Sequence, residues 1–296
     1  MSRLFNQTLL MSTVDYFDDS APINAFMDAS VTVDRDTARQ EHEQIRQAFI
    51  AAGVKVIQVP APAACQDGVY TANWALVRGD IAVLANLPNV RQSEQPYAEQ
   101  ILKQQGKTVL RLPETVRFSG QGDALPCGNY LFIGSGYRTD PAAHQFVSEA
   151  LGYEAIPLQT VPLLDTQGQP VINAYSGWPD SFFYDIDLAL AVLRNPDDSH
   201  KGLIAWCPDA FTSESQAKLR SFDTVDKIEV SLKEAKEDYA CNLVSTGETV
   251  IMSASAPEFK AAVEAHGLTT ITPHVAELAK GGGYIRCTSL MLDNPA

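Results

Sequence analysis

The order of the predicted elements repeats along the chain, and this repetition constrains the fold more than any other feature. Each unit runs from a strand or hairpin into a helix whose apolar residues recur every three or four positions, and then into another strand. Glycines such as Gly53 and Gly152 stand where helices end. We predict strands at 54–59, 108–112, 129–133, 154–158, 202–206, 226–230, 243–252 and 268–271, a hairpin over 67–84, and helices at 36–52, 93–105, 141–151, 213–219 and from a cap at Ser255 to Gly267.

The repeated order favours a closed ring of ββαβ units. Its alternative is a doubly wound α/β sheet, which needs a glycine-rich turn after the first strand. That turn reads Pro60, Ala61 and Pro62, so the ring is preferred. With 296 residues, of which 45% are hydrophobic, the chain can bury a large core. Because no break in composition divides it, we expect a single domain over residues 1–296.

The chain is acidic, with a formal net charge of −14 at pH 7. Phosphate binding needs a basic surface, so nucleic acid is not an expected partner. The N-terminus, Met1 to Gln7, lacks the basic start and apolar run of a signal peptide, and no stretch has membrane-spanning length. We therefore expect a cytoplasmic protein with no membrane partner.

The cysteines are odd in number and widely scattered, without a C-x-x-C pair: Cys65, Cys127, Cys207, Cys241 and Cys287. A disulfide framework needs paired cysteines, and a zinc site needs closely spaced ligands. We expect reduced thiols and no metal site. Nothing near Cys127, Cys207 or Cys241 resembles a general base, so these three are interpreted as structural.

Three consecutive glycines, Gly281 to Gly283, stand shortly before Cys287. A packed strand gains nothing from adjacent glycines, which instead let the backbone bend sharply or approach another group closely. Cys287 is thus expected on a tight loop, anchored by a strand over 288–292. Beside Arg286, in surroundings that favour the thiolate, it is a candidate nucleophile. The other interpretation is a buried structural cysteine after a flexible loop.

Residues 11–28 are polar and turn-rich but carry the apolar side chains of Tyr16, Phe17 and Phe26. We expect a loop that packs over the body of the protein. Within it, Asn24 is either a turn residue or a polar group that faces a site.

Several short motifs resemble, in the same order, those of the guanidine-modifying superfamily of arginine deiminases, dimethylarginine dimethylaminohydrolases and amidinotransferases. The resemblance spans 11–287 and is greatest to the arginine dihydrolase and arginine-deiminase-related branch. It implies a five-bladed α/β propeller, or pentein, with the active site on its central axis. The residues that carry it are Asp15-Tyr16-Phe17 with Ile23-Asn24 and Met27, Asp67 with Thr71-Ala72-Asn73, Arg91 with Glu94, Ser119 with Gly122-Asp123, Gly134 to Arg138, Tyr184 to Asp187, and the glycine turn before Cys287.

The resemblance also implies a role for each matched position. Cys287 is the nucleophile; Asn24 lies at the substrate pocket; Asp67 and Asn73 belong to the first hairpin, where Asn73 positions the C–N group; Asp187 binds the guanidinium; Asp123 braces the inner ring; and Arg91 and Arg138 hold a carboxylate. A guanidinium suits this last role because it binds carboxylates bidentately. From residue type alone, Asn73 is also compatible with a polar strand residue facing solvent, and either arginine with an ordinary surface charge.

Two positions depart from the family pattern. Ser119 stands where the family has a glutamate, and Asp185 where it has the catalytic histidine. That histidine moves protons while the cysteine adds to the guanidinium carbon and while water later cleaves the thiouronium intermediate. An aspartate does so only if burial or a neighbouring carboxylate raises its pKa, and Asp187, expected on the same side of a strand, is such a neighbour.

Three outcomes therefore stay open. Asp185 moves the proton for a substrate unlike free arginine, or His274 does so from another unit, or the chain binds an amino acid or a partner without turnover. The remaining histidines, His42, His144, His200 and His266, are expected to face solvent, and Trp74 and Trp178 to lie in the core or a pocket wall.

The sequence thus predicts a hydrolase, without cofactor or metal, that acts on a C–N bond of a small guanidino or ureido compound with an arginine-like amino acid end. Cys287 attacks and Asp185 handles the protons. An amidinotransferase, which would need an amine acceptor in place of water, is the enzymatic alternative. A homodimer is compatible with the sequence.

Overall fold

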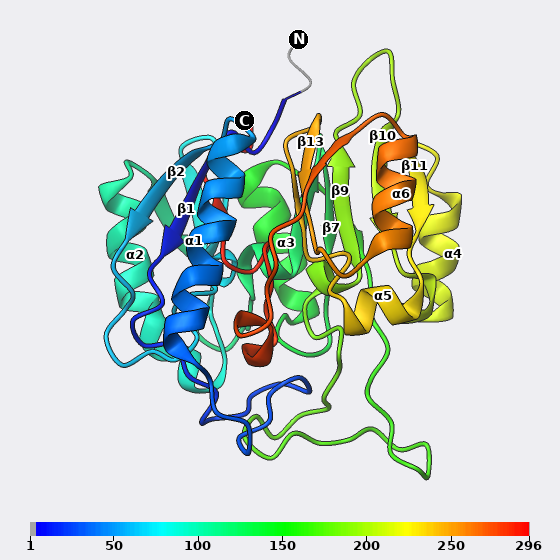
Figure 1. Cartoon of the computed structure of the whole chain (residues 1–296). Coiled ribbons are helices and arrows are strands. Elements are labelled where there is room, and N and C mark those ends of the chain that lie inside the picture. Colours follow the sequence, from blue (N-terminus) through cyan, green and yellow to red (C-terminus); the bar gives the residue numbers. More distant parts are fainter. Residues whose placement is uncertain (1–3, 296) are drawn as a thin grey trace.

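The computed structural model describes residues 4–295, which form an α/β protein of small sheets with helices around them (Figure 1). Met1 to Arg3, part of the segment considered above for a signal peptide, lie outside the described residues. The helices are α1 (Arg35–Ala51), α2 (Gln95–Gln104), α3 (Pro141–Leu151), α4 (Ser213–Ser221), α5 (Leu232–Glu237) and α6 (Pro257–Ala265). The strands are β1 (Thr8–Ser12), β2 (Lys55–Val59), β3 (Ala75–Arg78), β4 (Ile81–Leu84), β5 (Thr108–Arg111), β6 (Ala124–Cys127), β7 (Tyr130–Ile133), β8 (Glu154–Pro157), β9 (Leu190–Arg194), β10 (Gly202–Trp206), β11 (Val225–Glu229), β12 (Val244–Ser245), β13 (Thr249–Ile251), β14 (Thr269–Ile271) and β15 (Leu290–Met291).

Residues 4–295 form five three-stranded sheets of one topology. In each, the middle strand pairs antiparallel with one neighbour and parallel with the other. In β3-β4-β5, for example, Leu76 lies opposite Val83, and Ala82 opposite Val109. A helix joins the two parallel strands of each unit, namely α1, α2, α3, α4 or α6. The first sheet is completed from the C-terminus, where β15 pairs with β1. The repetition predicted from the sequence is thus present in the structure.

The core consists of the inner strands and the helix faces that cover them. Leu9, Phe132 and Trp206 have no solvent exposure, and in Figure 1 α2 and α4 lie on opposite sides of the molecule. Burial of such apolar side chains stabilises the fold by about 25 cal/mol per Å² removed from water. None of the helices within residues 4–295 has the length and apolar character needed to cross a membrane.

Four elements were not predicted. The short strands β1, β6 and β9 and the helix α5 lie beside turn-rich sequence that hides their periodicity. The first of them overlaps the start of the segment 11–28, which was expected to be a loop throughout. The predicted strand 243–252 is two strands, because the chain turns between β12 and β13, where Gly247 has a φ of 92° and Thr246 Oγ1 accepts a hydrogen bond from the Thr249 amide at 3.0 Å.

The cap of α6 also differs from the prediction. This helix begins at Pro257 after Ala256, so Ser255 is not its cap. The carboxylate of Glu234, from α5, instead accepts hydrogen bonds from the amides of Glu258 and Phe259, both at 2.9 Å. A carboxylate at a helix N-terminus satisfies amides that have no partner within the helix. Tertiary packing has replaced the local cap.

Two long loops, 13–34 and 158–185, cover one end of the molecule and are called the lid segments below. They lie together at the lower end of Figure 1, away from the C-terminus. Asn173 Nδ2 donates to the carbonyl of Pro22 at 3.4 Å, and the rings of Phe26 and Phe182 meet edge to face at 5.1 Å. The first lid segment packs on the body of the protein, as predicted for most of 11–28.

Candidate active site

The glycine turn before Cys287 lies directly against the lid side of the protein. Residues Leu278–Gly281 form a 3₁₀ turn, and Gly282 then has a φ of 87°, a conformation that side chains disfavour. A side chain at Gly281 or Gly283 would collide with Tyr70, and one at Gly282 with Asn24. The glycines are therefore required by close approach, and they bring Cys287 onto a tight loop, as predicted.

Cys287 is 2% exposed, and its thiol faces polar partners. It donates to Asp187 Oδ2 at 3.6 Å, while Asn242 Nδ2 donates to Sγ at 3.2 Å. The side-chain oxygen of Asn242 accepts from the Cys287 amide at 3.2 Å, so this asparagine orients both ends of the residue. Asn242 was missed in the sequence, where it stands in a turn without a recognisable motif. The thiol is buried, but in polar rather than purely apolar surroundings.

The electrostatic environment of the thiol differs from the expectation. Burial raises the pKa of the Cys287 thiol well above its usual value, and the negative charge of Asp187 raises it further. The hydrogen bond from Asn242 acts in the opposite direction but is the smaller effect. Arg286 is itself buried, and burial lowers its pKa. The protein alone therefore favours the neutral thiol rather than the thiolate expected beside an arginine.

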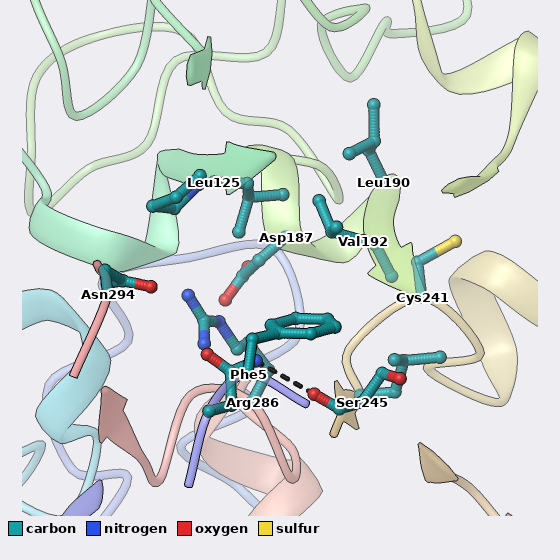
Figure 2. A pocket seen from close by; sticks show the side chains of 13 residues that line it. Phe5, Leu125, Asp187, Leu190, Val192, Cys241, Ser245, Arg286 and Asn294 are labelled. Atoms are coloured by element: carbon teal, nitrogen blue, oxygen red, sulfur yellow. Dashed lines mark hydrogen bonds between the residues drawn. The ribbon is translucent and has the colours of Figure 1, made fainter. Parts of the chain in front are cut away.

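Asp187 connects the thiol to a small internal cavity. Its side chain has no solvent exposure, and its Oδ1 has no hydrogen-bond partner among the described residues. Burial first, and the charge of Asp185 second, raise the pKa of Asp187 well above its usual value. Figure 2 shows its carboxylate and the guanidinium of Arg286 facing one cavity of about 30 Å³. Among the described residues that line this cavity, Arg286 is the only arginine or lysine.

Asp185 lies beside Asn73 and Arg138. Asn73 Nδ2 donates to Asp185 Oδ2 at 2.8 Å, and Arg138 Nη1 lies 3.6 Å from the same oxygen. A side chain at Gly122 would collide with both Asn73 and Asp185, so this glycine of the matched motif makes room for their contact. Asp185 precedes a 3₁₀ turn, Ile186–Leu188, so the prediction that it shares a strand face with Asp187 is wrong.

Asn73 and Arg91 are buried, which excludes the solvent-facing alternatives. Arg91 binds both oxygens of Glu94, with Nε to Oε1 at 2.8 Å and Nη2 to Oε2 at 2.9 Å. Its Nη1 donates to Asn73 Oδ1 at 2.6 Å, and its Nη2 also reaches the carbonyls of Asp67 and Tyr70. Asn73 is thus held from both sides of its amide. Most of the donors of Arg91 are already engaged within the protein.

The other matched residues lie around this network. Ser119 accepts from Asn73 Nδ2 at 3.0 Å through both its carbonyl and its hydroxyl. Asp123 accepts from the Ile186 amide at 3.0 Å, and burial together with the charge of Asp185 raises the pKa of Asp123 to about 8. Burial raises the pKa of Asp67 to about 6. Asp67 also lines a surface pocket of about 350 Å³ beneath the first lid segment.

Arg138 and Asn24 reach the site from the lid side. The guanidinium of Arg138 lies 3.9 Å from the ring centre of Tyr184, a cation–π contact, and its side chain is nearly buried. An ordinary surface charge is therefore excluded here too. Asn24 donates to the carbonyl of Gly281 at 3.0 Å and accepts from the Phe26 amide at 3.0 Å. The structure thus brings Asn73, Arg138 and Asp185 together, and places Asp187 against Cys287.

His200 and His266 face solvent, as predicted, but the other histidines do not support the predictions made for them. His274 is exposed, and within residues 4–295 the described side-chain partners of Cys287, Asp185 and Asp187 are not histidines. His42 and His144 are buried rather than solvent-facing. Burial lowers the pKa of His42 to about 4, and His144 bonds the carbonyl of Gly134 at 2.8 Å. Burial also lowers the pKa of His144, so both are neutral core residues.

Fold and site together define a class: an α/β protein of the pentein kind, with a cysteine among carboxylates and arginines. A family of eukaryotic N,N dimethylarginine dimethylhydrolases matches residues 14–173. The N(G),N(G)-dimethylarginine dimethylaminohydrolase of Mycobacterium tuberculosis is 31% identical over 284 residues, which are 95% of this chain and 84% of that protein. The chain belongs to the dimethylarginine dimethylaminohydrolase family. The superfamily indicated by the motifs is confirmed.

Arginine dihydrolases are also similar. The bifunctional arginine dihydrolase/ornithine cyclodeaminase AgrE of Nostoc sp. is 28% identical over 291 residues, which are 97% of this chain but 38% of that longer protein. A crystal structure of AgrE with ornithine and NAD+ has a TM-score of 0.83 at 26% identity, covering 98% of this chain and 39% of that one. The substrate-bound N-terminal domain of ArgZ, a cyanobacterial arginine dihydrolase, shares the fold, with a TM-score of 0.83 at 24% identity and coverage of 97% and 98%.

Proposed function

We propose that the chain is a cysteine-dependent hydrolase that acts on a C–N bond of a small guanidino or ureido compound with an arginine-like amino acid end. The observation that carries this proposal is the 3.6 Å contact from the Cys287 thiol to Asp187 Oδ2, made in a buried polar site. A nucleophile and a base within reach of one another are the minimum for covalent catalysis. The relatives named for dimethylarginine and arginine hydrolysis support the substrate class.

The first half of the reaction uses the contact between the thiol and Asp187. Asp187 takes the thiol proton, the sulfur forms a bond to the central guanidinium carbon, and the C–N bond to ammonia or an amine breaks as that proton passes to the leaving nitrogen. The product is a thiouronium bound to Cys287. In this step Asp187, the neighbour of the thiol, has the role that the sequence assigned to Asp185.

The second half needs a base for water. Asp185 has no solvent exposure, and its Oδ1 has no hydrogen-bond partner among the described residues. We assign to it the proton of the water that attacks the thiouronium carbon. The C–S bond then breaks, the sulfur leaves as thiolate and regains a proton, and the urea-type product is released. Asn73, which holds Asp185 Oδ2, keeps this carboxylate in place.

A cationic substrate would itself activate the thiol. Burial and two carboxylates raise the pKa of Cys287, so the free protein holds its proton. A guanidinium beside Asp185 and Asp187 would compensate their charge and favour the thiolate. Activation then accompanies binding, which protects the thiol in the empty site.

The amino acid end of the substrate has several candidate partners. Arg138 is the better candidate for a carboxylate, because most donors of Arg91 are engaged with Glu94, Asn73 and main-chain carbonyls. Arg91 then acts by fixing Asn73. Asp67, in the pocket of about 350 Å³, is suited to a substrate ammonium group. Ser119 and Asp123 brace Asn73 and the turn after Asp185, and Asn24 lines the lid side.

We further propose that the five sheets are the blades of one closed propeller and that residues 1–296 form a single domain. Contacts from β15 to β3, from β6 to β9 and from β9 to β12 link neighbouring sheets. The last and first sheets are linked by Asn6 Nδ2, which donates to the carbonyl of Ser245 at 3.0 Å. The reduced cysteines and acidic composition support a cytoplasmic protein. A homodimer stays a prediction, which light scattering checks.

Two observations favour a second candidate, a binding protein without turnover. The family histidine is replaced by Asp185, and the thiol pKa is raised rather than lowered. The two candidates are separated by incubating the protein with a panel of guanidino and ureido amino acids and measuring ammonia, amine and urea-type products. The hydrolase predicts turnover that the Cys287→Ser variant lacks. Ligand-induced thermal stabilisation without product from any compound would support the binding protein instead.

A further inference from the structure

The loop that carries Cys287 is held by side chains from distant parts of the chain. Four of its carbonyls each accept a hydrogen bond from a different side chain: Leu278 from Tyr70 Oη at 2.6 Å, Ala279 from Tyr239 Oη at 2.9 Å, Gly281 from Asn24 Nδ2 at 3.0 Å, and Gly282 from Tyr184 Oη at 2.5 Å. All four donors are buried. We call Asn24, Tyr70, Tyr184 and Tyr239 the loop clamp.

The start of the same loop is held from its amide side. The buried carboxylate of Glu41, in α1, accepts from the amides of Ala276, Glu277 and Leu278 at 2.8 to 3.1 Å. Hydrogen bonds to a charged acceptor are among the stronger ones in proteins. Side chains therefore bind both the backbone amides and the backbone carbonyls of the loop at residues 276–282, ahead of the cysteine.

These hydrogen bonds matter because the backbone of this glycine-rich loop has high conformational freedom on its own. Three consecutive glycines lose more conformational entropy on ordering than any other residues would. A nucleophile must nevertheless be held to within about 0.5 Å of its productive position. After Gly283 the segment has other side-chain anchors, because Ser253 bonds Tyr284 and Asn242 bonds Cys287. The clamp holds the glycine stretch itself, at the carbonyls of Gly281 and Gly282.

We infer that the loop clamp positions Cys287 for attack and couples this positioning to closure of the lid segments. Asn24 belongs to the first lid segment, and Tyr184 stands at the end of the second. Tyr184 also carries Arg138 on its ring, and Phe26 of the first lid segment packs against Tyr184 and Tyr239. Displacing either lid segment removes a hydrogen bond from the loop, so access to the site and order of the nucleophile are linked. The inference rests on the proposed function.

The clamp residues act through Cys287 and are positioning residues. Each tyrosine hydroxyl donates its proton to a carbonyl, which leaves none to give to a substrate. Burial raises the pKa of Tyr70, Tyr184 and Tyr239, so all three stay protonated. The amide of Asn24 is likewise occupied by Gly281 and Phe26. This assigns Asn24 a role in holding the loop, in place of the substrate contact implied by the family resemblance.

The test removes one hydroxyl at a time, in Tyr184→Phe and Tyr70→Phe. Tyr153→Phe is the matched control, because the buried hydroxyl of Tyr153 has no partner among the described residues and lies outside the site. We expect kcat to fall by about 10²-fold in the clamp variants, with KM nearly unchanged, because small misplacement of a reacting group has effects of this size. The control keeps the kcat of the natural protein.

Cys287 labelling gives a readout that does not depend on turnover. The rates for 2-chloroacetamidine, which resembles the substrate group, and for iodoacetamide are compared in each variant. A loosened loop reacts more slowly with the directed reagent and faster with the undirected one, so we expect their rate ratio to fall about ten-fold or more. An unchanged ratio and kcat in folded Tyr184→Phe and Tyr70→Phe would overturn the inference. If the natural protein turns over no compound, the proposed hydrolase fails while the labelling ratio still decides the role of the clamp.

Discussion

The site contains two kinds of buried carboxylate: Glu94, which is fully paired with Arg91, and Asp185 and Asp187, which are not fully bonded within residues 4–295. Arg91 and Glu94 form a closed pair, in which two hydrogen bonds join the guanidinium to the carboxylate. The indole nitrogen of Trp74 adds a third bond to the glutamate at 2.9 Å. Asp185 and Asp187, by contrast, each keep one oxygen without a hydrogen-bond partner among the described residues.

The difference separates scaffold from chemistry. A fully bonded buried pair has little capacity left for a ligand, and breaking it leaves an uncompensated charge. A buried carboxylate with an unused oxygen is costly to the folded state but ready to bind a cation or a proton. The closed pair therefore holds Asn73 in place, while Asp187, one of the two open carboxylates, contacts Cys287. The following predictions test this division.

The largest effect is expected for the nucleophile. Cys287→Ser should lower turnover by at least about 10³-fold, because a hydroxyl at this position has no base strong enough to activate it. Steady-state product release measures this. Cys127→Ala, a buried cysteine on β6 outside the site, is the control and should retain activity. Comparable loss in both variants would mean that the effect is structural.

Replacing Asp187 should lower turnover but raise the reactivity of the Cys287 thiol. Asp187→Asn removes the base, and turnover should fall by about 10²–10⁴-fold. It also removes a negative charge that raises the thiol pKa, so iodoacetamide should label Cys287 faster at neutral pH. Slower labelling together with slower turnover would contradict the role given to Asp187. Asp293→Asn, near the C-terminus, serves as the control.

Breaking the pair of Arg91 and Glu94 should destabilise the folded protein. Arg91→Met leaves Glu94 buried without its partner, and we expect a loss of about 3–5 kcal/mol in the free energy of unfolding. Asp187→Asn relieves repulsion with Asp185 and should leave the stability equal or higher. Urea unfolding of the two variants measures both. Equal destabilisation would remove the distinction between closed and open groups.

The last prediction concerns the dependence of stability on pH. Burial and Asp185 raise the pKa of Asp123 from 3.8 to about 8, so the folded state binds this proton more tightly than the unfolded state. Its contribution to stability is full below about pH 4, declines as the pH rises and is lost above about pH 8. Asp123→Asn should flatten this part of the profile in thermal melts. A variant whose stability falls with pH as steeply as the natural protein would contradict the assignment.

Elements with strong periodicity could be predicted from the sequence. The helix expected at 36–52 is α1, Arg35–Ala51, because its apolar stripe and terminal glycine are local signals. Strands of five residues or fewer, such as β1, β6 and β9, could not be found where turn residues surround them. Their pairing partners lie in other parts of the chain, and β1 pairs with β15 across almost the full sequence.

Site residues could be predicted from the sequence only where they lie in recognisable motifs. Cys287, Asp187 and Asn73 were identified from residue patterns that resemble those of the superfamily. Asn242 was missed because its importance arises from a contact across the fold, at 3.2 Å from the sulfur. The raised thiol pKa could not be foreseen either, because the burial that causes it arises from packing between distant parts of the chain.

The central claim is that Cys287 is an active nucleophile in a site that recognises a planar amidine-type cation. Incubation with 2-chloroacetamidine, followed by mass spectrometry of the peptides, tests it most directly. We predict one adduct, on Cys287, that forms faster than with iodoacetamide and is suppressed by an arginine-like guanidino compound. Absence of an adduct on Cys287, or labelling spread over the other cysteines without such protection, would contradict the claim.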